Sequence, residues 1–260
     1  TEKILKVFEN LKEIYILKIF LINDYCPKNS WKEVKKNKNI ILIHHSKNLG
    51  VGAASISGFK AALKEKCDVI VKIDADEQHN PFYLKELIPY ILNLETNKMV
   101  LIKGTRYLYP ELSYNTPFIR KLGSLLLEPM IRSSLNYRGL TDVTNGFLVI
   151  NNFTLNFIMI SRIGPRLRKR YLFECSLLEK CSSIGVEIHE FGMVSIYSKI
   201  WRSSMQSYKM IFPLLSFCTR SIFRRFFYGY LLKINLGSIL FLISISNFLL
   251  AAILYFEKIS

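Results

Sequence analysis

Two aspartates that end an apolar run are the residues of this sequence best placed for chemistry. Residues 69–73 form a short run rich in β-branched side chains, Asp74 and Asp76 follow it, and Gln78 comes two positions later. Successive side chains of a strand point to opposite faces, so carboxylates two residues apart can point the same way. Such a pair can hold a hard divalent cation together with phosphate oxygens, which predicts metal-assisted chemistry on a diphosphate. A simple turn before Pro81 would explain the same aspartates without a metal.

Strands that alternate with helices must position these carboxylates. Apolar runs predict strands at 16–22, 40–43, 69–73, 99–103, 143–150 and 186–194. Spacing and composition predict helices at 1–15, 53–65, 81–94, 106–141 and 171–183. The alternation predicts an α/β fold, with a mostly parallel sheet and helices on both faces. Ligands of open α/β sheets bind where the strands end, so Asp24, Asp74 and Arg106, which each follow a strand, are expected along one edge.

The charge of the chain and its C-terminal composition indicate a membrane partner. The 260 residues carry a formal charge of +16, which suits either nucleic acid or an anionic membrane together with phosphorylated substrates. Residues 236–256 contain no charged side chain and approach the roughly 20 residues that cross a bilayer. Four basic residues precede them: Arg220, Arg224, Arg225 and Lys233. We therefore expect a membrane partner and no nucleic acid, although a buried core helix remains the alternative for this segment.

The same distribution of charge predicts the domain organisation and the topology. Basic flanks stay on the cytoplasmic side of a membrane span, so the preceding domain is expected in the cytoplasm with a single C-terminal anchor. The expected parts are a main domain at 1–200, amphipathic juxtamembrane helices at 201–233 and a transmembrane helix at 234–257. No pattern in the sequence indicates an oligomeric state.

Five segments, taken in chain order, carry a family resemblance. They are Ile22–Ser30, Asn48–Ala54, Asp74–His79, Lys103–Tyr107 and Thr141–Phe147. Together they resemble the motifs of family 2 glycosyltransferases, specifically the polyprenyl-phosphate type exemplified by dolichol-phosphate mannose synthase. The resemblance implies the GT-A fold, which is a Rossmann-like sheet with flanking helices. The strand with which the family begins has no counterpart before the predicted helix at 1–15, so either the chain is a fragment or one edge of its sheet is altered.

The resemblance implies a role for each matched residue. The donor-binding residues would be Asp24, Gly50, Asp74 and Gln78. The ligands of Mg²⁺ or Mn²⁺ would be Asp74, Asp76 and Gln78. The acceptor phosphate would be held by Arg120, Ser124 and Arg202, and the catalytic residues would be Asp76, Arg106 and Asp142. Taken singly, the aspartates and the glycine also fit turns and caps, and the arginines also fit solvated surface charges.

The implied reaction is an inverting transfer of a sugar to a polyprenyl phosphate. The donor would be a UDP- or GDP-linked sugar, and the transfer would take place at the cytoplasmic face of the membrane. A second reading keeps this fold and changes the acceptor to another lipid or to a growing glycan. A third reading is a catalytically inactive scaffold tethered to the membrane.

Overall fold

The computed structural model divides the chain into two compact units, residues 1–205 and 206–260. The residues that it describes are 2–34, 37–76, 78–94, 97–113, 116, 118–135, 137, 139–194, 211–227, 237, 239–240 and 242–248.

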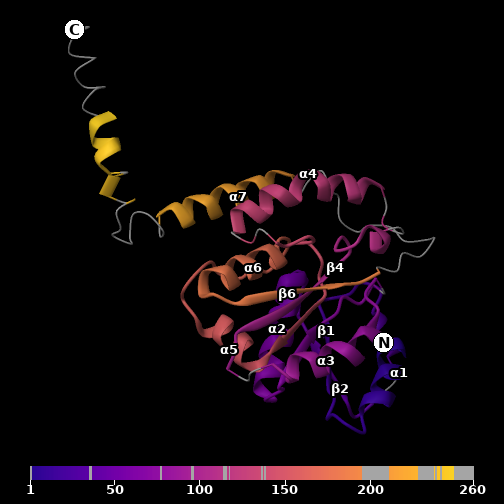
Figure 1. Cartoon of the computed structure of the whole chain (residues 1–260). Coiled ribbons are helices and arrows are strands. Elements are labelled where there is room, and N and C mark those ends of the chain that lie inside the picture. Colours follow the sequence, from indigo (N-terminus) through magenta and orange to yellow (C-terminus); the bar gives the residue numbers. More distant parts are fainter. Residues whose placement is uncertain are drawn as a thin grey trace. The chain divides into compact units, whose positions relative to one another are not determined.

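The first unit alternates strands with helices and confirms the predicted α/β class (Figure 1). Its strands are β1 (Ile19–Asn23), β2 (Ile40–His44), β3 (Val69–Lys72), β4 (Val100–Thr105), β5 (Leu148–Asn151) and β6 (Glu187–Gly192). Its α-helices are α1 (Glu2–Leu11), α2 (Val51–Lys64), α3 (Leu84–Leu92), α4 (Phe118–Leu135), α5 (Asn152–Ile160) and α6 (Phe173–Ile184). Three short 3-10 helices join them: η1 (Ser30–Glu33), η2 (Pro81–Tyr83) and η3 (Pro110–Ser113).

The described strands form two sheets, which corrects the prediction of a mostly parallel arrangement. β1 and β2 pair in parallel, while the other four strands lie in the order β3-β5-β4-β6. β5 is antiparallel to both of its neighbours, and only β4 and β6 pair in parallel within this sheet. The reason is the path of the chain after α4, which returns to the edge where β3 and β4 end. β5 therefore starts at that edge and runs against its neighbours.

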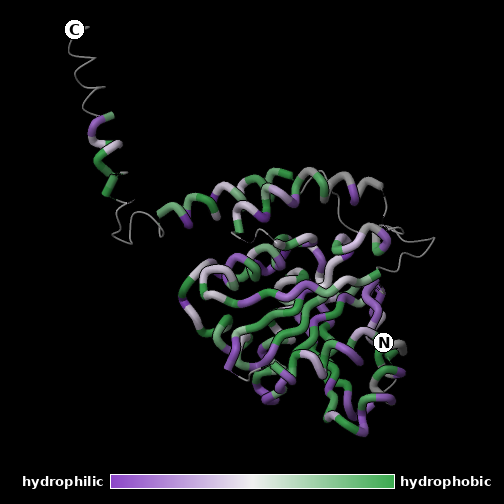
Figure 2. The backbone as a smooth tube through the Cα atoms, in the orientation of Figure 1, coloured by the Kyte–Doolittle hydropathy of each residue, from purple (hydrophilic) through white to green (hydrophobic). Residues whose placement is uncertain are grey.

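Apolar side chains bury both faces of the four-stranded sheet. Leu148 and Ile150 of β5 pack in one cluster with residues from α2, α5 and α6. Val149, on the opposite face, packs with residues from α1 and α3. This alternation is expected from a strand that is buried on both sides. Figure 2 accordingly shows that the residues of these strands, in the interior of the first unit, are largely hydrophobic.

Three predicted elements differ from the structure. The helix predicted at 106–141 is shorter, since α4 spans only Phe118–Leu135 and the short 3-10 helix η3 precedes it. The strand predicted at 143–150 begins only at Leu148, because the residues before it form a loop that carries polar side chains into the interior. Helix α5 follows that strand at once and was absent from the prediction. The Asn151 side chain accepts a hydrogen bond from the Thr154 N–H at 2.9 Å and caps this helix. An asparagine before a helical run is a recognised start signal, so α5 could have been found from the sequence.

The second unit contains helix α7 (Ile211–Phe226), which falls within the segment predicted to be amphipathic and juxtamembrane. Its last turn carries Arg224 and Arg225. Within the described residues, no helix combines the length and the apolarity needed to cross a bilayer. Most of the predicted transmembrane segment at 234–257 lies outside the described residues.

Candidate active site

The ends of β3 and β4 and the start of β5 meet at one edge of the sheet. The register pairs Leu148, the first residue of β5, with both Lys72 and Lys103. Asp74 and Arg106, which follow β3 and β4, are thereby brought to the same edge as the loop at 141–147, which precedes β5. The predicted convergence is confirmed for Asp74 and Arg106, whereas Asp24 follows β1, which belongs to the other sheet.

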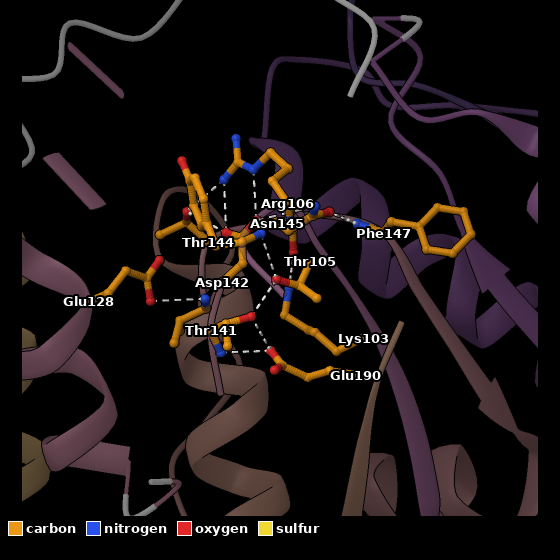
Figure 3. A network of polar contacts seen from close by, with 12 residues as sticks. Lys103, Thr105, Arg106, Glu128, Thr141, Asp142, Thr144, Asn145, Phe147 and Glu190 are labelled. Atoms are coloured by element: carbon orange, nitrogen blue, oxygen red, sulfur yellow. Dashed lines mark hydrogen bonds and ion pairs between the residues drawn. The ribbon is translucent and has the colours of Figure 1, made fainter. Parts of the chain in front are cut away.

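An ion pair between Arg106 and Asp142 forms the centre of this edge (Figure 3). Arg106 Nε donates to Asp142 Oδ2 at 2.7 Å, Arg106 Nη2 donates to Oδ1 at 2.8 Å, and the Arg106 backbone N–H also donates to Oδ2 at 3.1 Å. Burial alone would raise the pKa of Asp142, but the Arg106 guanidinium outweighs it and lowers that pKa. Asp142 is fully buried and orients Arg106, and its predicted catalytic role stays a prediction.

Two buried lysines donate hydrogen bonds to backbone carbonyls of the loop at 141–147. Lys103 Nζ donates to the Asn145 carbonyl, and Lys72 Nζ donates to the Gly146 carbonyl at 3.0 Å. Burial lowers the pKa of Lys103, whereas the carboxylates of Glu174 and Asp74 overcome the burial of Lys72 and raise its pKa. Motif matching missed both lysines. The available signal was a lysine inside each of two otherwise apolar strands.

Asp74 is engaged by this buried charge cluster. Its Oδ1 accepts from Lys72 Nζ at 2.7 Å, and Lys72 Nζ also lies 3.3 Å from Glu174 Oε1 on α6. The Asp74 backbone N–H donates to His79 Nδ1 at 3.2 Å. A Cβ atom on Gly146 would lie 2.1 Å from Asp74 Oδ2, so only glycine lets the loop approach this carboxylate so closely. Lys72 thus compensates the charge of Asp74 and fixes its orientation.

Asp76 forms the more open part of the edge, whereas Gln78 beside it is buried. Asp76 is exposed, and its Oδ2 accepts from Gln78 Nε2 at 2.5 Å while its Oδ1 accepts from the Gln78 backbone N–H at 3.2 Å. The side chains at this corner offer oxygen donors, which hard divalent cations prefer. Among the residues that the structure describes, no group of three or more His, Cys, Asp and Glu side chains is placed to hold a metal. An ion such as Mg²⁺ would need substrate phosphates and water to complete its shell here, and its binding stays a prediction.

Asp24 is bound to its own neighbouring loop. Its carboxylate accepts from the backbone N–H groups of Leu49 at 2.8 Å and Gly50 at 2.7 Å, and it lies 2.7 Å from His45 Nδ1. Burial would raise the pKa of Asp24, but the hydrogen bonds from His45 and the two N–H groups outweigh it and lower that pKa. The structure thus shows Asp24 as the anchor of the loop before α2. A contact with the donor stays a prediction.

The glycines before α2 make room for another segment of the chain. A Cβ atom on Gly52 would lie 2.1 Å from the Arg168 carbonyl oxygen, and one on Gly50 would lie 2.6 Å from Arg170 Cγ. The Ala53 N–H donates to the Lys169 carbonyl at 2.7 Å, so this basic segment satisfies a free donor at the start of the helix. The close approach explains both glycines, and the predicted contact between Gly50 and the donor stays a prediction.

The structure does not describe the side chains of the three residues predicted to hold the acceptor phosphate. Arg120 and Ser124 belong to α4, and their side chains are outside the described part of the chain. Arg202 lies outside the described residues altogether. Their contacts therefore stay predictions.

Comparison with known proteins assigns the chain to a family. The family model of Glycosyl transferase family 2 matches residues 2–148, which is more than half of the chain. The chain belongs to this family. The resemblance read from the five motifs is thereby confirmed, and with it the GT-A type of α/β fold.

Relatives of this family 2 glycosyltransferase act on lipid phosphates, as their names state. An undecaprenyl-phosphate mannosyltransferase of Micrococcus luteus is 26% identical over 193 residues, which are 72% of this chain and 75% of that protein. A UDP-N-acetylglucosamine--dolichyl-phosphate N-acetylglucosaminyltransferase of Methanococcus voltae is 30% identical over 192 residues, 67% of this chain and 73% of that protein. A dolichol-phosphate mannosyltransferase of Pyrococcus furiosus is 26% identical over 201 residues, 71% of this chain and 53% of that protein.

The contact between Gly146 and Asp74 predicts the effect of a single methyl group on this glycosyltransferase. Gly146→Ala places a Cβ atom 2.1 Å from Asp74 Oδ2 and 2.9 Å from Lys72 Nζ, so the carboxylate has to move. Overpacking of this kind costs about 1–3 kcal/mol of unfolding free energy. Displacement of a site residue by about 1 Å costs on the order of a hundredfold in rate. Denaturant unfolding and steady-state kinetics measure the two effects.

Gly139→Ala is the matched control, because a Cβ atom at Gly139 meets no atom within 4 Å. We expect this variant to keep the stability and the rate of the parent. A Gly146→Ala protein with parental rate and stability would show that the close packing around Asp74 has no functional weight.

Proposed function

We propose that this family 2 glycosyltransferase transfers a sugar from a UDP- or GDP-linked donor to a polyprenyl phosphate. The observation that carries the proposal is the edge of the four-stranded sheet, where the buried side chains of Arg106, Lys72 and Lys103 lie near the exposed Asp76. Fixed cations at such an edge suit phosphate groups on both substrates. The names of relatives that cover about 70% of the chain support a lipid phosphate as the acceptor.

The proposed reaction is a single displacement. An oxygen of the acceptor phosphate attacks the anomeric carbon, the bond to the nucleoside diphosphate breaks, and the configuration inverts. The acceptor phosphate is already an anion at neutral pH, so no side chain has to remove a proton from it. The task of the protein is to hold two anionic substrates in line and to offset their charge. Arg106 suits this task, because Asp142 keeps its guanidinium in a fixed orientation.

A divalent cation fits the donor side of this site. Asp76 and Gln78 would hold Mg²⁺ or Mn²⁺, with Asp74 beside them, and the ion would supply Lewis-acid stabilisation of the departing diphosphate. The Lys72 ammonium keeps Asp74 ionised, since the pKa of Asp74 is lowered although burial alone would raise it. We propose that Arg120, Ser124 and Arg202 meet the acceptor phosphate.

We also propose that the chain works at the cytoplasmic face of a membrane. The support is the uncharged segment at 236–256 and the basic residues before it, of which Arg224 and Arg225 end helix α7. Positive flanks stay on the cytoplasmic side. A lipid acceptor would then reach the site from the bilayer.

The experiment that tests the proposed function is a donor panel. Membranes that contain the full chain are incubated with labelled UDP- and GDP-sugars, and the label in the lipid-soluble fraction is counted. We expect one or a few donors to give a lipid product that mild acid releases as sugar. Label that appears in glycan and never in lipid would favour the second reading, with a glycan acceptor. The absence of any transfer from every donor would contradict the proposal and favour an inactive scaffold.

A further inference from the structure

Helix α4 carries a buried carboxyl group that the proposed reaction does not use. Glu128 is 3% exposed, and its Oε2 accepts from the Val143 backbone N–H at 3.0 Å. Its second oxygen, Oε1, is buried and has no hydrogen-bond partner within the described structure. The nearest basic residue of the same helix, Arg132, bonds backbone carbonyls and leaves this oxygen alone. A buried carboxylate oxygen without a partner is costly, which favours a proton on this group.

The loop at 141–147 links Glu128 to the ion pair of the site. Glu128 binds the N–H of Val143, and Asp142, the preceding residue, binds Arg106 (Figure 3). In the figure the Glu128 side chain points from its helix toward this loop. The carboxyl group thus contacts the loop that holds Arg106.

Charged groups from several elements surround this position. Asp142 lies on the loop, Lys103 lies in β4, and Arg106 follows that strand. The charges of all three side chains influence the pKa of Glu128. β6 contributes Glu190, whose carboxylate accepts from the Thr141 N–H at 2.7 Å. Helix α6, which packs against α4, carries the charged side chains Glu174, Glu179 and Lys180. Burial and the charge of Asp142 together raise the pKa of Glu128 from the usual 4.5 to about 7.

We propose that Glu128 is a positioning residue whose proton controls how tightly the Arg106 edge binds the acceptor phosphate. With its proton, Glu128 is neutral and adds no charge to the buried cluster of Lys103, Arg106 and Asp142. Without its proton, Glu128 adds a negative charge to the same buried cluster and opposes a phosphate anion. Acceptor affinity therefore falls as the pH rises through neutrality. This inference rests on the proposed function, because it takes the acceptor to be a phosphate.

The first test is the pH dependence of the acceptor KM in the purified full chain. We expect the KM for polyprenyl phosphate to rise about tenfold between pH 6 and pH 8.5, which corresponds to about 1.4 kcal/mol. Glu128→Gln keeps an acceptor for the Val143 N–H and cannot ionise, so its KM should stay near the low-pH value. The second ionisation of the acceptor itself, near pH 6, is common to both proteins and cancels in the comparison. The KM for the nucleotide sugar should depend on pH in the same way in the parent and in Glu128→Gln.

Glu190→Gln is the matched control, because it alters the other carboxylate that anchors the same loop. We expect this variant to keep the pH dependence of the parent. A dependence that disappears in Glu190→Gln and persists in Glu128→Gln would overturn the proposal, and so would equal curves for all three proteins. Glu128→Asp, which still ionises, should retain a pH-dependent KM.

A stability measurement separates this proposal from the proposed function. A carboxyl group with a raised pKa stabilises the fold at low pH, and that contribution is lost as the pH rises toward about 7. The unfolding free energy of the parent should therefore fall over this range relative to Glu128→Gln. If this difference appears and the acceptor KM is independent of pH, the link to phosphate is wrong although Glu128 titrates. If no protein transfers sugar to polyprenyl phosphate, the proposed function itself is wrong.

Discussion

Replacing Asp76 by asparagine is expected to reduce sugar transfer at least about a thousandfold. The reason is the loss of one ligand charge at the open end of the site, which weakens both the proposed cation and the diphosphate that it would bridge. A thousandfold lower rate corresponds to a loss of about 4 kcal/mol in transition-state stabilisation, since each 1.4 kcal/mol changes the rate about tenfold. Asp76 is exposed, so the fold should tolerate the change.

The measurement is the initial rate of lipid-linked product at saturating donor, with and without added Mg²⁺ or Mn²⁺. Asp68→Asn is the matched control, because Asp68 is also exposed and stands at the start of β3, at the opposite edge of the sheet. We expect the control to keep its rate and the parent to lose its rate on treatment with EDTA. Parental activity in Asp76→Asn, or activity that EDTA leaves unchanged, would remove the metal from the mechanism.

Asp142→Asn is expected to cost about 3–5 kcal/mol of unfolding free energy, as the breaking of a buried ion pair does. Arg106 is 6% exposed and would keep its charge next to a neutral amide. Because the pKa of Asp142 is lowered, its stabilisation is present at neutral pH and is lost as the pH falls below about 4. Denaturant unfolding at pH 7 and at a series of pH values below about 4 measures both effects.

A double variant, Arg106→Gln with Asp142→Asn, provides the control for this pair. With both charges gone, no uncompensated charge is left in the interior, so the double variant should be more stable than the sum of the single changes predicts. Additive costs would show that the two side chains do not act as a pair. A cost below about 1 kcal/mol for Asp142→Asn would match a surface ion pair and contradict the buried geometry.

The sequence was sufficient for the α/β class, for most strands and for the edge where they end. Apolar runs and the spacing of polar residues are local signals, and they placed Asp74 and Arg106 correctly at a common edge, although they also placed there Asp24, which follows a strand of the other sheet. The direction of β5 was not accessible in this way, because an apolar run looks the same in parallel and antiparallel sheets. The strand count alone therefore predicted a mostly parallel sheet that the structure corrects.

The partners of the site residues were beyond the reach of local patterns. Asp74 shares Lys72 with Glu174, which is 100 positions away in the chain, and the glycines before α2 are explained by Arg168 and its neighbours. Such contacts depend on tertiary packing and leave no periodic trace. Glu128 was missed for the same reason, since one acidic residue in a helix looks like a surface charge until its burial is known.

The most direct test of the proposed function compares two acceptors that differ only in the phosphate group. Purified full chain is given its preferred nucleotide sugar with either a polyprenyl phosphate or the corresponding polyprenol in the same detergent. The proposed chemistry predicts sugar transfer to the phosphate and none above background to the alcohol, because the attacking atom is an ionised phosphate oxygen, whereas a hydroxyl group would need a general base. Equal transfer to both acceptors, or transfer to the alcohol alone, would contradict the assignment of the acceptor.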